Sequence, residues 1–210
     1  MPKAIELMKK REEELLKLIE RLSEETSLFS DPKLILIGGY ALRAFIPFTR
    51  YTRDCDFALR KTRKWKIDEL KEIMPEDYSV EALEKRGTYG FLRCIKFLEY
   101  DERRIKVSVD FMEGEIRGRE KDEVILIDNA MISNRRFVDI PVADGLVRIP
   151  VPSYVDYFIM KVVSARPSDI RDIASLLLNN GIPKDVENRA KEILPHSEVF
   201  RRKLSGEAFL

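Results

Sequence analysis

One stretch of this chain, residues 34–59 with the sequence LILIGGYALRAFIPFTRYTRDCDFAL, constrains its fold more than any other. It begins with a short apolar run, stops at Gly38 and Gly39, and continues with residues that favour a helix. It ends with Asp54 and Asp56, which are set among apolar residues. The predicted order is therefore strand, glycine turn, short helix, loop and acidic strand.

The glycine pair has two readings. Gly38 and Gly39 let the backbone turn sharply and approach a ligand closely, because no Cβ stands in the way. The free N–H groups at the start of the helix expected over about residues 40–45 would suit an anionic phosphate. A tight turn between a strand and a helix explains the same two residues without any ligand. Taken alone, the pair favours that turn.

The acidic strand shifts this balance. Residues i and i+2 of a strand lie on one face, about 6.6 Å apart, so Asp54 and Asp56 share a face opposite Cys55 and Phe57. Two like charges this close repel, and a hard divalent ion such as Mg²⁺ or Mn²⁺ would relieve the repulsion. A half-buried strand with a polar outer face explains the alternation but not two aspartates, which form strands poorly.

A third acid follows in residues 105–111, with the sequence IKVSVDF. Apolar residues alternate there with Lys106, Ser108 and Asp110, which predicts a second strand. If that strand pairs with residues 54–59, Asp110 lies near the two earlier aspartates. Three carboxylates could hold two metal ions, which activate an attacking oxygen and stabilise a leaving pyrophosphate.

These residues resemble a known superfamily. The elements shared with the DNA polymerase beta-like nucleotidyltransferases are Gly38-Gly39, Asp54-x-Asp56 and Asp110. A narrower likeness is to the branch that contains the AbiEii-type toxins of type IV toxin–antitoxin systems and related minimal nucleotidyltransferases. It rests on Arg50-x-Thr52-x-Asp54-x-Asp56 and on residues 149–177, which include Lys161, Arg166, Asp169 and Asp172. The resemblance covers about residues 33–180.

The resemblance implies an α+β fold, with a nucleotidyltransferase-like mixed β-sheet flanked by helices and a C-terminal helical subdomain. It implies that Asp54 and Asp56 bind the metal ions, and that Asp110 binds the second metal and helps to activate the acceptor. The implied nucleotide-binding residues are Gly38, Gly39, Tyr40, Arg50, Thr52 and Lys161. In that branch a lysine at the position of Lys161 and an acid in the following helix, here Asp169, face the nucleotide. The implied cofactor is Mg²⁺ or Mn²⁺, with a nucleoside triphosphate as substrate.

Two features depart from the family pattern. The interval between Gly39 and Asp54 is slightly longer than usual, and Tyr40 stands where many relatives have a small hydroxyl residue. Loss of that hydroxyl could weaken one phosphate contact.

Spacing alone predicts helices after residue 150. Apolar residues recur at helical intervals between Ser153 and Ala165, with Ser153 as the N-cap, and Ser168 is expected to cap a second helix after Pro167. The charged residues of these helices could also have purely structural roles. These are Lys161 as a surface lysine whose ammonium reaches solvent, Asp169 as a partner of the helix dipole, and Asp172 as a surface charge beside Arg166 or Arg171.

The 210 residues suit a core over 1–150 with an N-terminal helix over 3–26, and a helical subdomain over 151–210. Other expected elements are a short helix at 67–74, strands at 89–99, 104–112, 136–139 and 146–149, a segment at 118–132 ambiguous between helix and strand, and helices at 168–179, 184–193 and 196–205. A turn is expected at Asp101-Glu102.

Composition and charge limit the binding partners and the cellular compartment that are expected for this chain. The formal net charge is +1, so no overall field draws the chain to nucleic acid or membrane. The absence of a signal-like N-terminus or a spanning apolar run favours the cytoplasm, where Cys55 and Cys94 are expected as buried free thiols. Charged residues make up 36% of the chain and Gln is absent, a pattern typical of thermophile proteins. A basic cluster around Trp65, from Arg60 to Lys66, is more simply a solvated loop than a grip on nucleic acid.

The sequence therefore predicts a metal-dependent nucleotidyltransferase that moves a nucleoside monophosphate from a triphosphate to a hydroxyl. The acceptor stays open between RNA (a tRNA 3′ end), a protein and a small molecule. If the toxin resemblance holds, an antitoxin partner is expected. The alternative is a non-catalytic nucleotide-binding or partner-binding module on the same fold.

Overall fold

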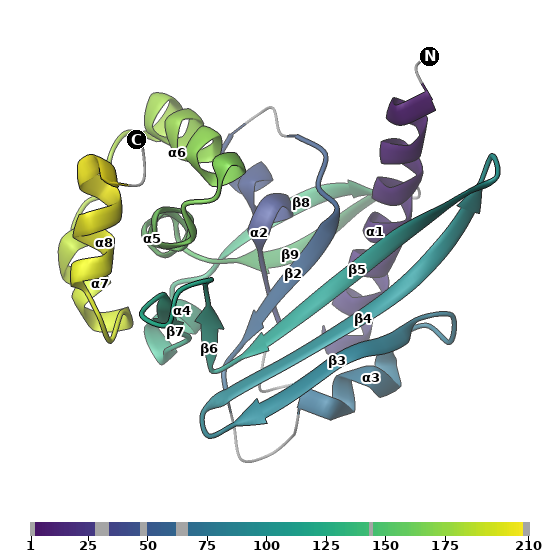
Figure 1. Ribbon diagram of the computed structural model, residues 1–210, viewed down its shortest axis with the longest axis horizontal. Coiled ribbons are helices and arrows are strands. Elements are labelled where there is room, and N and C mark those ends of the chain that lie inside the picture. Colours follow the sequence, from purple (N-terminus) through teal and green to yellow (C-terminus); the bar gives the residue numbers. More distant parts are fainter. Residues whose placement is uncertain (1–2, 28–33, 47–49, 62–66, 143–144, 208–210) are drawn as a thin grey trace.

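The computed structural model describes residues 3–27, 34–46, 50–61, 67–142 and 145–207 of the chain (Figure 1). In the first half the elements are α1 (Lys3–Ser27), β1 (Ile35–Ile37), α2 (Gly38–Ala41), the 3-10 turn η1 (Leu42–Ala44), β2 (Asp54–Leu59), the 3-10 turn η2 (Ile67–Glu69), α3 (Leu70–Ile73), β3 (Ser79–Arg86) and β4 (Tyr89–Tyr100). The second half has β5 (Arg103–Glu113), β6 (Glu115–Arg117), β7 (Val124–Leu126), α4 (Asn129–Ser133), β8 (Arg136–Val142), β9 (Gly145–Val151), α5 (Tyr154–Ser164), α6 (Pro167–Asn180), α7 (Val186–Ile193), α8 (Glu198–Arg202) and a π-helical turn (Lys203–Glu207).

A five-stranded mixed sheet forms the centre of the molecule, in the order β1-β2-β5-β4-β3. Only β2 and β5 run parallel, and the other neighbours are antiparallel. The parallel pairing confirms that the acidic strand lies beside the strand that carries Asp110. The expected α+β class, a mixed sheet flanked by helices, is also confirmed.

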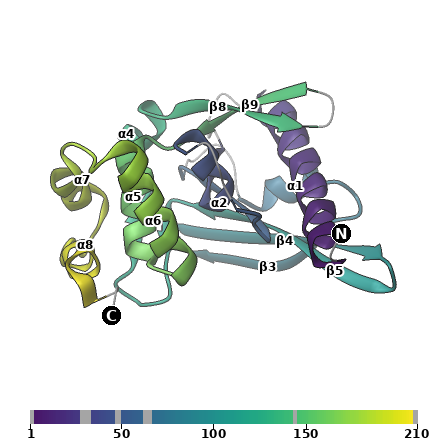
Figure 2. The same ribbon diagram turned by 90° about the horizontal axis from the view of Figure 1, so that it is seen from above.

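One face of this sheet is apolar and covered. Phe57 of β2 and Phe111 of β5 stack there, with ring centroids 5.6 Å apart. The buried stripe of α1, including Leu15, Ile19 and Leu22, is part of the same core. Figure 2 shows α1 between this sheet and the β8–β9 hairpin. The opposite face of β2 and β5 is therefore the one left for polar side chains, because side chains alternate between the faces of a strand.

The C-terminal helices α5 to α8 gather at one side of the sheet, next to β6, β7 and α4 (Figures 1 and 2). Their first helix begins as expected, since the Ser153 side chain accepts a hydrogen bond from the Asp156 backbone N–H. The expectation that Ser168 caps the next helix is wrong. Arg166 is the N-cap of α6, and Pro167 occupies its first turn, where a missing N–H costs nothing.

Two further differences follow from local chemistry. The edge strand β3 was not expected, because its sequence SVEALEKR is exposed on both faces and lacks a clear apolar period. The ambiguous segment at 118–132 contains β7 and all but the last residue of α4, and Asp128 caps α4 by accepting the Met131 N–H at 2.8 Å. The division into a core over 1–150 and a subdomain over 151–210 stays a prediction.

Cys55 and Cys94 are buried free thiols, as expected from their places on apolar strand faces. In the described parts of the chain, none of the helices combines the length and the apolar character that crossing a membrane requires.

Candidate active site

The glycine turn lies against the acidic strand. Gly38 opens α2 with a φ of +66°, and a Cβ placed on it would lie 2.1 Å from Oδ2 of Asp56. A Cβ on Gly39 would lie 2.2 Å from Cγ2 of Thr52. Both positions therefore require glycine, the first for its backbone conformation and its close approach, the second for its close approach alone.

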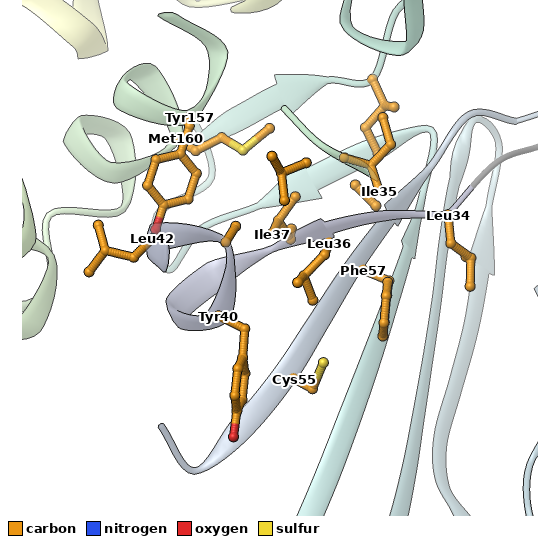
Figure 3. Close-up of a cluster of buried hydrophobic side chains, with 14 of the residues drawn as sticks. Leu34, Ile35, Leu36, Ile37, Tyr40, Leu42, Cys55, Phe57, Tyr157 and Met160 are labelled. Atoms are coloured by element: carbon orange, nitrogen blue, oxygen red, sulfur yellow. The ribbon is translucent and has the colours of Figure 1, made fainter. Parts of the chain in front are cut away.

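A helix far along the chain fixes this turn. The hydroxyl of Tyr157 in α5 donates a hydrogen bond of 2.7 Å to the carbonyl oxygen of Gly38. In Figure 3 the Tyr157 ring points down onto the start of α2. Asn180, at the end of α6, donates a second hydrogen bond of 2.9 Å to the carbonyl oxygen of Phe45. The C-terminal helices thus help to set the position of the glycine turn.

The predicted carboxylates share one face of the sheet. Asp56 pairs in register with Asp110 across the parallel β2–β5 ladder, while Asp54 pairs with Ser108. Burial and the neighbouring charges of Asp54 and Asp110 raise the pKa of Asp56 to about 7. The positive charges of Arg166 and Lys161 oppose that rise without cancelling it. The carboxyl of Asp56 therefore loses its proton less readily than that of an exposed aspartate.

The third carboxylate has a partner that sequence analysis missed. Arg93 of β4 is opposite Asp110 in the β4–β5 ladder, and its Nε and Nη2 atoms lie 2.7 and 2.5 Å from the two carboxylate oxygens. This bidentate, charge-assisted geometry is the strongest kind of arginine–carboxylate pair. Hydrogen bonding to Asp110 also raises the pKa of Arg93, so the guanidinium stays charged.

A second charged cluster joins α5 to α6. Lys161 is buried, with 5% of its surface exposed, and its Nζ lies 2.8 Å from Asp169 and 2.9 Å from Asp172. The suggestion that Lys161 extends to solvent is therefore wrong, and so is the reading of Asp172 as a surface charge. Asp172 is buried and also accepts two hydrogen bonds from Arg50, at 3.3 and 3.2 Å.

Asp169 combines both of its suggested roles. It is the third residue of α6, where it accepts a hydrogen bond from the Arg166 backbone, and it also lines the central cavity. Burial alone would raise the pKa of Asp169, but the charge and hydrogen bond of Lys161 bring that pKa below its ordinary value. Asp169 is thus an ionised carboxylate held between a lysine and an arginine.

Three of the predicted nucleotide-binding side chains lie behind the site. The Tyr40 side chain is fully buried, extends away from α2 with Cys55 beside its ring in the view of Figure 3, and has no hydrogen-bond partner for its hydroxyl among the described residues. Thr52 is buried and donates to the carbonyl oxygen of Asp54 at 2.9 Å, so it supports the acidic strand. Arg50 orients Asp172. Any contact of Tyr40 with a phosphate would come from its backbone.

A cavity of about 500 Å³ lies over the carboxylates, within the usual size range of small-molecule sites. Its acidic lining residues are Asp54, Asp56, Asp110, Asp169 and Glu84, its cationic ones are Arg93, Arg117, Arg119, Lys161 and Arg166, and its apolar and aromatic ones include Tyr89, Phe91, Met112, Ile116, Ile125 and Met160. Gly38 also borders it. The cavity thus combines carboxylates that suit a cation with basic residues that suit phosphates.

The carboxylates fit a divalent cation in part. Asp54 and Asp56 supply hard oxygen ligands, and burial, followed by the charges of Asp54 and Asp110, raises the pKa of Asp56. Among the described residues, however, no group of three acidic, histidine or cysteine side chains is arranged to hold a metal ion. Asp110 directs both of its oxygens to Arg93 instead. The predicted set of three metal ligands is therefore not assembled in this structure.

The sequence does contain a signal for Arg93. Asp101 and Glu102 both have positive φ and form a two-residue hairpin turn between β4 and β5. Such a turn fixes the register of its strands, and counting back from it places Arg93 opposite Asp110. Most of the basic cluster around Trp65 lies outside the described residues. Of its first members, Lys61 pairs with Glu113 and Arg60 donates a hydrogen bond to Asn129.

A mixed sheet with a glycine turn packed against an Asp-x-Asp strand, and a further aspartate on the neighbouring parallel strand, defines a nucleotidyltransferase-like protein. The chain belongs to the AbiEii family, because the family model described as "Nucleotidyl transferase AbiEii toxin, Type IV TA system" matches residues 21–205. Membership in this family supports nucleotidyl transfer as its general activity.

Comparison with curated proteins found no match. Among solved structures, the chain is similar to a candidate nucleotidyltransferase from H. pylori, with a TM-score of 0.47 and 15% identity over 84% of this chain and 73% of that one. It is also similar to JHP933 from Helicobacter pylori, with a TM-score of 0.46 and 14% identity over 84% and 71% of the two chains. Both likenesses are too distant to say anything about activity.

Proposed function

We propose that this chain is a metal-dependent nucleotidyltransferase that moves a nucleoside monophosphate from a nucleoside triphosphate to a hydroxyl group. The observation that carries the proposal is the close packing of Gly38 against Asp56, on the sheet face where Asp54 and Asp110 also lie. A glycine turn and a row of carboxylates in one cavity suit a triphosphate bound together with a cation.

The residues would divide the work of binding. Asp54 and Asp56 would hold a divalent ion, Mg²⁺ or Mn²⁺, and the Gly38-Gly39 backbone would border the phosphates. Lys161 and Arg166 would add positive charge beside them, with Asp169 and Asp172 keeping Lys161 in place. Arg50 would act through Asp172, and Thr52 through the backbone carbonyl of Asp54 at the start of β2.

The chemistry would rest on position and charge. A bound divalent ion would supply Lewis-acid polarisation of the α-phosphate. Once free of Arg93, Asp110 would accept the proton of the acceptor hydroxyl, whose oxygen then bonds to the α-phosphorus while the bond to pyrophosphate breaks. Preorganised charges in a cavity of this kind account for most of the rate in phosphoryl-type transfers.

The acceptor and the partner are further parts of the proposal. The basic lining of the cavity, with Arg117 and Arg119, would suit an RNA acceptor such as a tRNA 3′ end, while a protein or small-molecule hydroxyl is chemically equivalent. The family description supports an antitoxin as a partner. The buried free thiols of Cys55 and Cys94 support a reducing compartment such as the cytoplasm.

The test is transfer of label from each α-³²P nucleoside triphosphate, with Mg²⁺ or Mn²⁺, onto total tRNA and total protein of the host. The double variant Asp54→Asn/Asp56→Asn should lose transfer by at least about a thousandfold, in line with removal of the charges that stabilise a transition state. Asp139→Asn is the matched control, since Asp139 is an exposed aspartate on β8, outside the cavity.

Undiminished transfer by the double variant would refute the mechanism. Nucleotide binding without transfer to tRNA, protein or a panel of small hydroxyl compounds would instead support the alternative, a non-catalytic nucleotide-binding or partner-binding module. The engagement of Asp110 by Arg93 is the observation that favours this second candidate.

A further inference from the structure

The Arg93–Asp110 pair is built into the sheet. Asp110 is buried with only 5% of its side chain exposed, whereas the Arg93 side chain is 37% exposed and reaches the cavity. Because the two residues are direct partners in the β4–β5 ladder, their side chains leave the same face at neighbouring positions. The pair is therefore a product of strand register rather than of a chance surface contact.

Neighbouring groups hold the arginine in place. Its Nη1 atom lies 4.0 Å from Glu81 on β3, and its guanidinium lies 5.5 Å from the centre of the Phe91 ring. Glu81 is itself paired with Lys106 of β5. Arg93 thus belongs to a small network of charged side chains that spans β3, β4 and β5.

The pair changes what Asp110 can bind. A guanidinium that engages both carboxylate oxygens neutralises the charge that would attract a cation, and a divalent ion on the same oxygens would meet a positive group directly beside it. By contrast, no cationic side chain among the described residues donates a hydrogen bond to Asp54 or Asp56. Asp54 and Asp56 are therefore available to bind a cation, whereas Asp110 is already paired with Arg93.

We infer that Arg93 takes the place of a second cation at Asp110, so that the nucleotide-free protein binds one divalent ion, through Asp54 and Asp56, rather than two. Arg93 is a positioning residue in this inference, because it acts through Asp110. Asp110 becomes a ligand only when Arg93 leaves it, and the acceptor-activating role of Asp110 has the same requirement. The inference rests on the proposed function for the identity of the metal-binding pair.

The experiment counts bound Mn²⁺ on the full chain without nucleotide, at about pH 8, by titration calorimetry and by loss of the free-ion electron paramagnetic resonance signal. The wild type should bind one ion per chain. Arg93→Met, which keeps the length of the side chain but removes its charge, should bind two. Arg117→Met is the matched control, since Arg117 lines the same cavity and pairs with Glu115 rather than with Asp110. This control should bind one ion.

A neutral double variant keeps the test decisive if Arg93→Met fails to fold. Arg93→Met/Asp110→Asn removes both charges, and a buried pair replaced by neutral residues is often tolerated. Since Asp110 is not a ligand in the inferred state, this variant should bind one ion with an affinity within about threefold of the wild type. A loss of affinity of more than about tenfold would overturn the inference.

Several other results would overturn the inference. Two ions or none in the wild type, one ion in a folded Arg93→Met, or a second ion in Arg117→Met would each overturn the role given to Arg93. The label-transfer assay distinguishes failure of this inference from failure of the proposed function. A wild type that binds one ion but transfers no label refutes the function alone, and a wild type that binds two ions and transfers label refutes the inference alone.

Discussion

The backbone of Gly38 and the carboxylate of Asp56 are in direct contact, and a single added methyl group at Gly38 would lie 2.1 Å from Oδ2. The turn and the acidic strand are therefore one structural unit, in which the position of the carboxylate depends on the absence of a side chain at residue 38. A change at this glycine should reach the chemistry of the site even though glycine has no functional group of its own.

Replacing this glycine tests the dependence. Gly38→Ala should lose at least about a hundredfold in transfer activity, because misplacing a reacting group by about 1 Å has an effect of that size. The positive φ adds a stability cost of about 1–3 kcal/mol. Gly87→Ala is the control, since Gly87 has a φ of +60° but no atom within 4 Å of an added Cβ. It should cost stability without loss of activity, and equal activity losses in both variants would contradict the prediction. Urea unfolding and label transfer measure the two effects.

The raised pKa of Asp56 predicts a pH dependence of metal binding. Below about pH 7 the carboxyl holds a proton that an incoming ion must displace, so Mn²⁺ affinity should fall as the pH decreases from 8 to 6. Binding near pH 7 should release a fraction of a proton, which calorimetry in buffers of different ionisation enthalpy measures. A flat affinity across this range would show that Asp56 titrates at its ordinary pKa.

Stability without metal should depend on pH through the same group. The folded-state pKa of Asp56 lies above the unfolded value, so between about pH 4 and pH 7 the folded state binds more protons. This contribution to stability is therefore present at low pH and is lost as the pH rises through about 7. Melting curves in a chelator should show a larger decrease in Tm between pH 5 and pH 8 for the wild type than for Asp56→Asn. An equal decrease in Tm for the wild type and for Asp56→Asn would contradict the raised pKa of Asp56.

The buried lysine should be important for stability. Lys161→Met leaves Asp169 and Asp172 buried with less positive charge, which typically costs about 3–5 kcal/mol. Adding Asp172→Asn should recover part of the loss, because one of the two stranded charges is removed. Lys191→Met is the matched control at an exposed helix position, and it should change the free energy of unfolding by less than about 0.5 kcal/mol. Urea unfolding of the variants checks each value, and a loss at Lys161 as small as the control would refute the buried network.

A second buried network should act on stability alone. Arg189 of α7 bonds to Asp156 of α5 at 2.7 Å and to Asp128, the N-cap of α4, at 2.8 Å. Arg189→Met should therefore destabilise the protein by about 3–5 kcal/mol. Arg201→Met, which breaks an exposed pair with Glu187, should cost less than about 1 kcal/mol. Under conditions where both variants are folded, the Mn²⁺ count should stay that of the wild type, and a changed count would link this network to the site.

Removal of the buried Tyr40 hydroxyl should not lower the stability of the protein, in contrast to the substitutions of Lys161 and Arg189. Tyr40→Phe removes a buried polar group that has no hydrogen-bond partner in the described structure, so stability should be unchanged or higher. Transfer activity should also be unchanged, because the side chain lies away from the cavity. A loss of nucleotide affinity would restore Tyr40 to the predicted binding residues.

Local patterns were sufficient for much of this fold. The period-2 alternation in residues 105–111 and the Asp-x-Asp strand placed three carboxylates on strand faces, and the structure brings Asp56 and Asp110 into register. Alternation carries no information about partners, so the pairing of the two strands was an inference that spacing alone could not establish, and its parallel direction was not predicted. The β4–β5 turn was predicted, but its consequence for Arg93 was not worked out.

Burial of charge was the least predictable feature. Lys161 and Asp172 have ordinary helical spacing, which is equally compatible with a solvated surface and with a buried ion cluster. The difference lies in Arg50, whose loop brings a second cation to Asp172 from a distant part of the chain. Such an arrangement depends on tertiary structure, and helical periodicity does not encode it.

The parts of the site come from widely separated stretches of the chain, from Gly38 through Asp56 and Asp110 to Asp169. A ribosome that has released only the first half of the protein therefore presents a glycine turn without the parallel strand or the lysine cluster beside it. The pairing of β2 with β5 also requires closure of a long intervening segment, which is a slow event in folding. The site described here can therefore form only after β5, α5 and α6 have been synthesised and have packed beside the glycine turn.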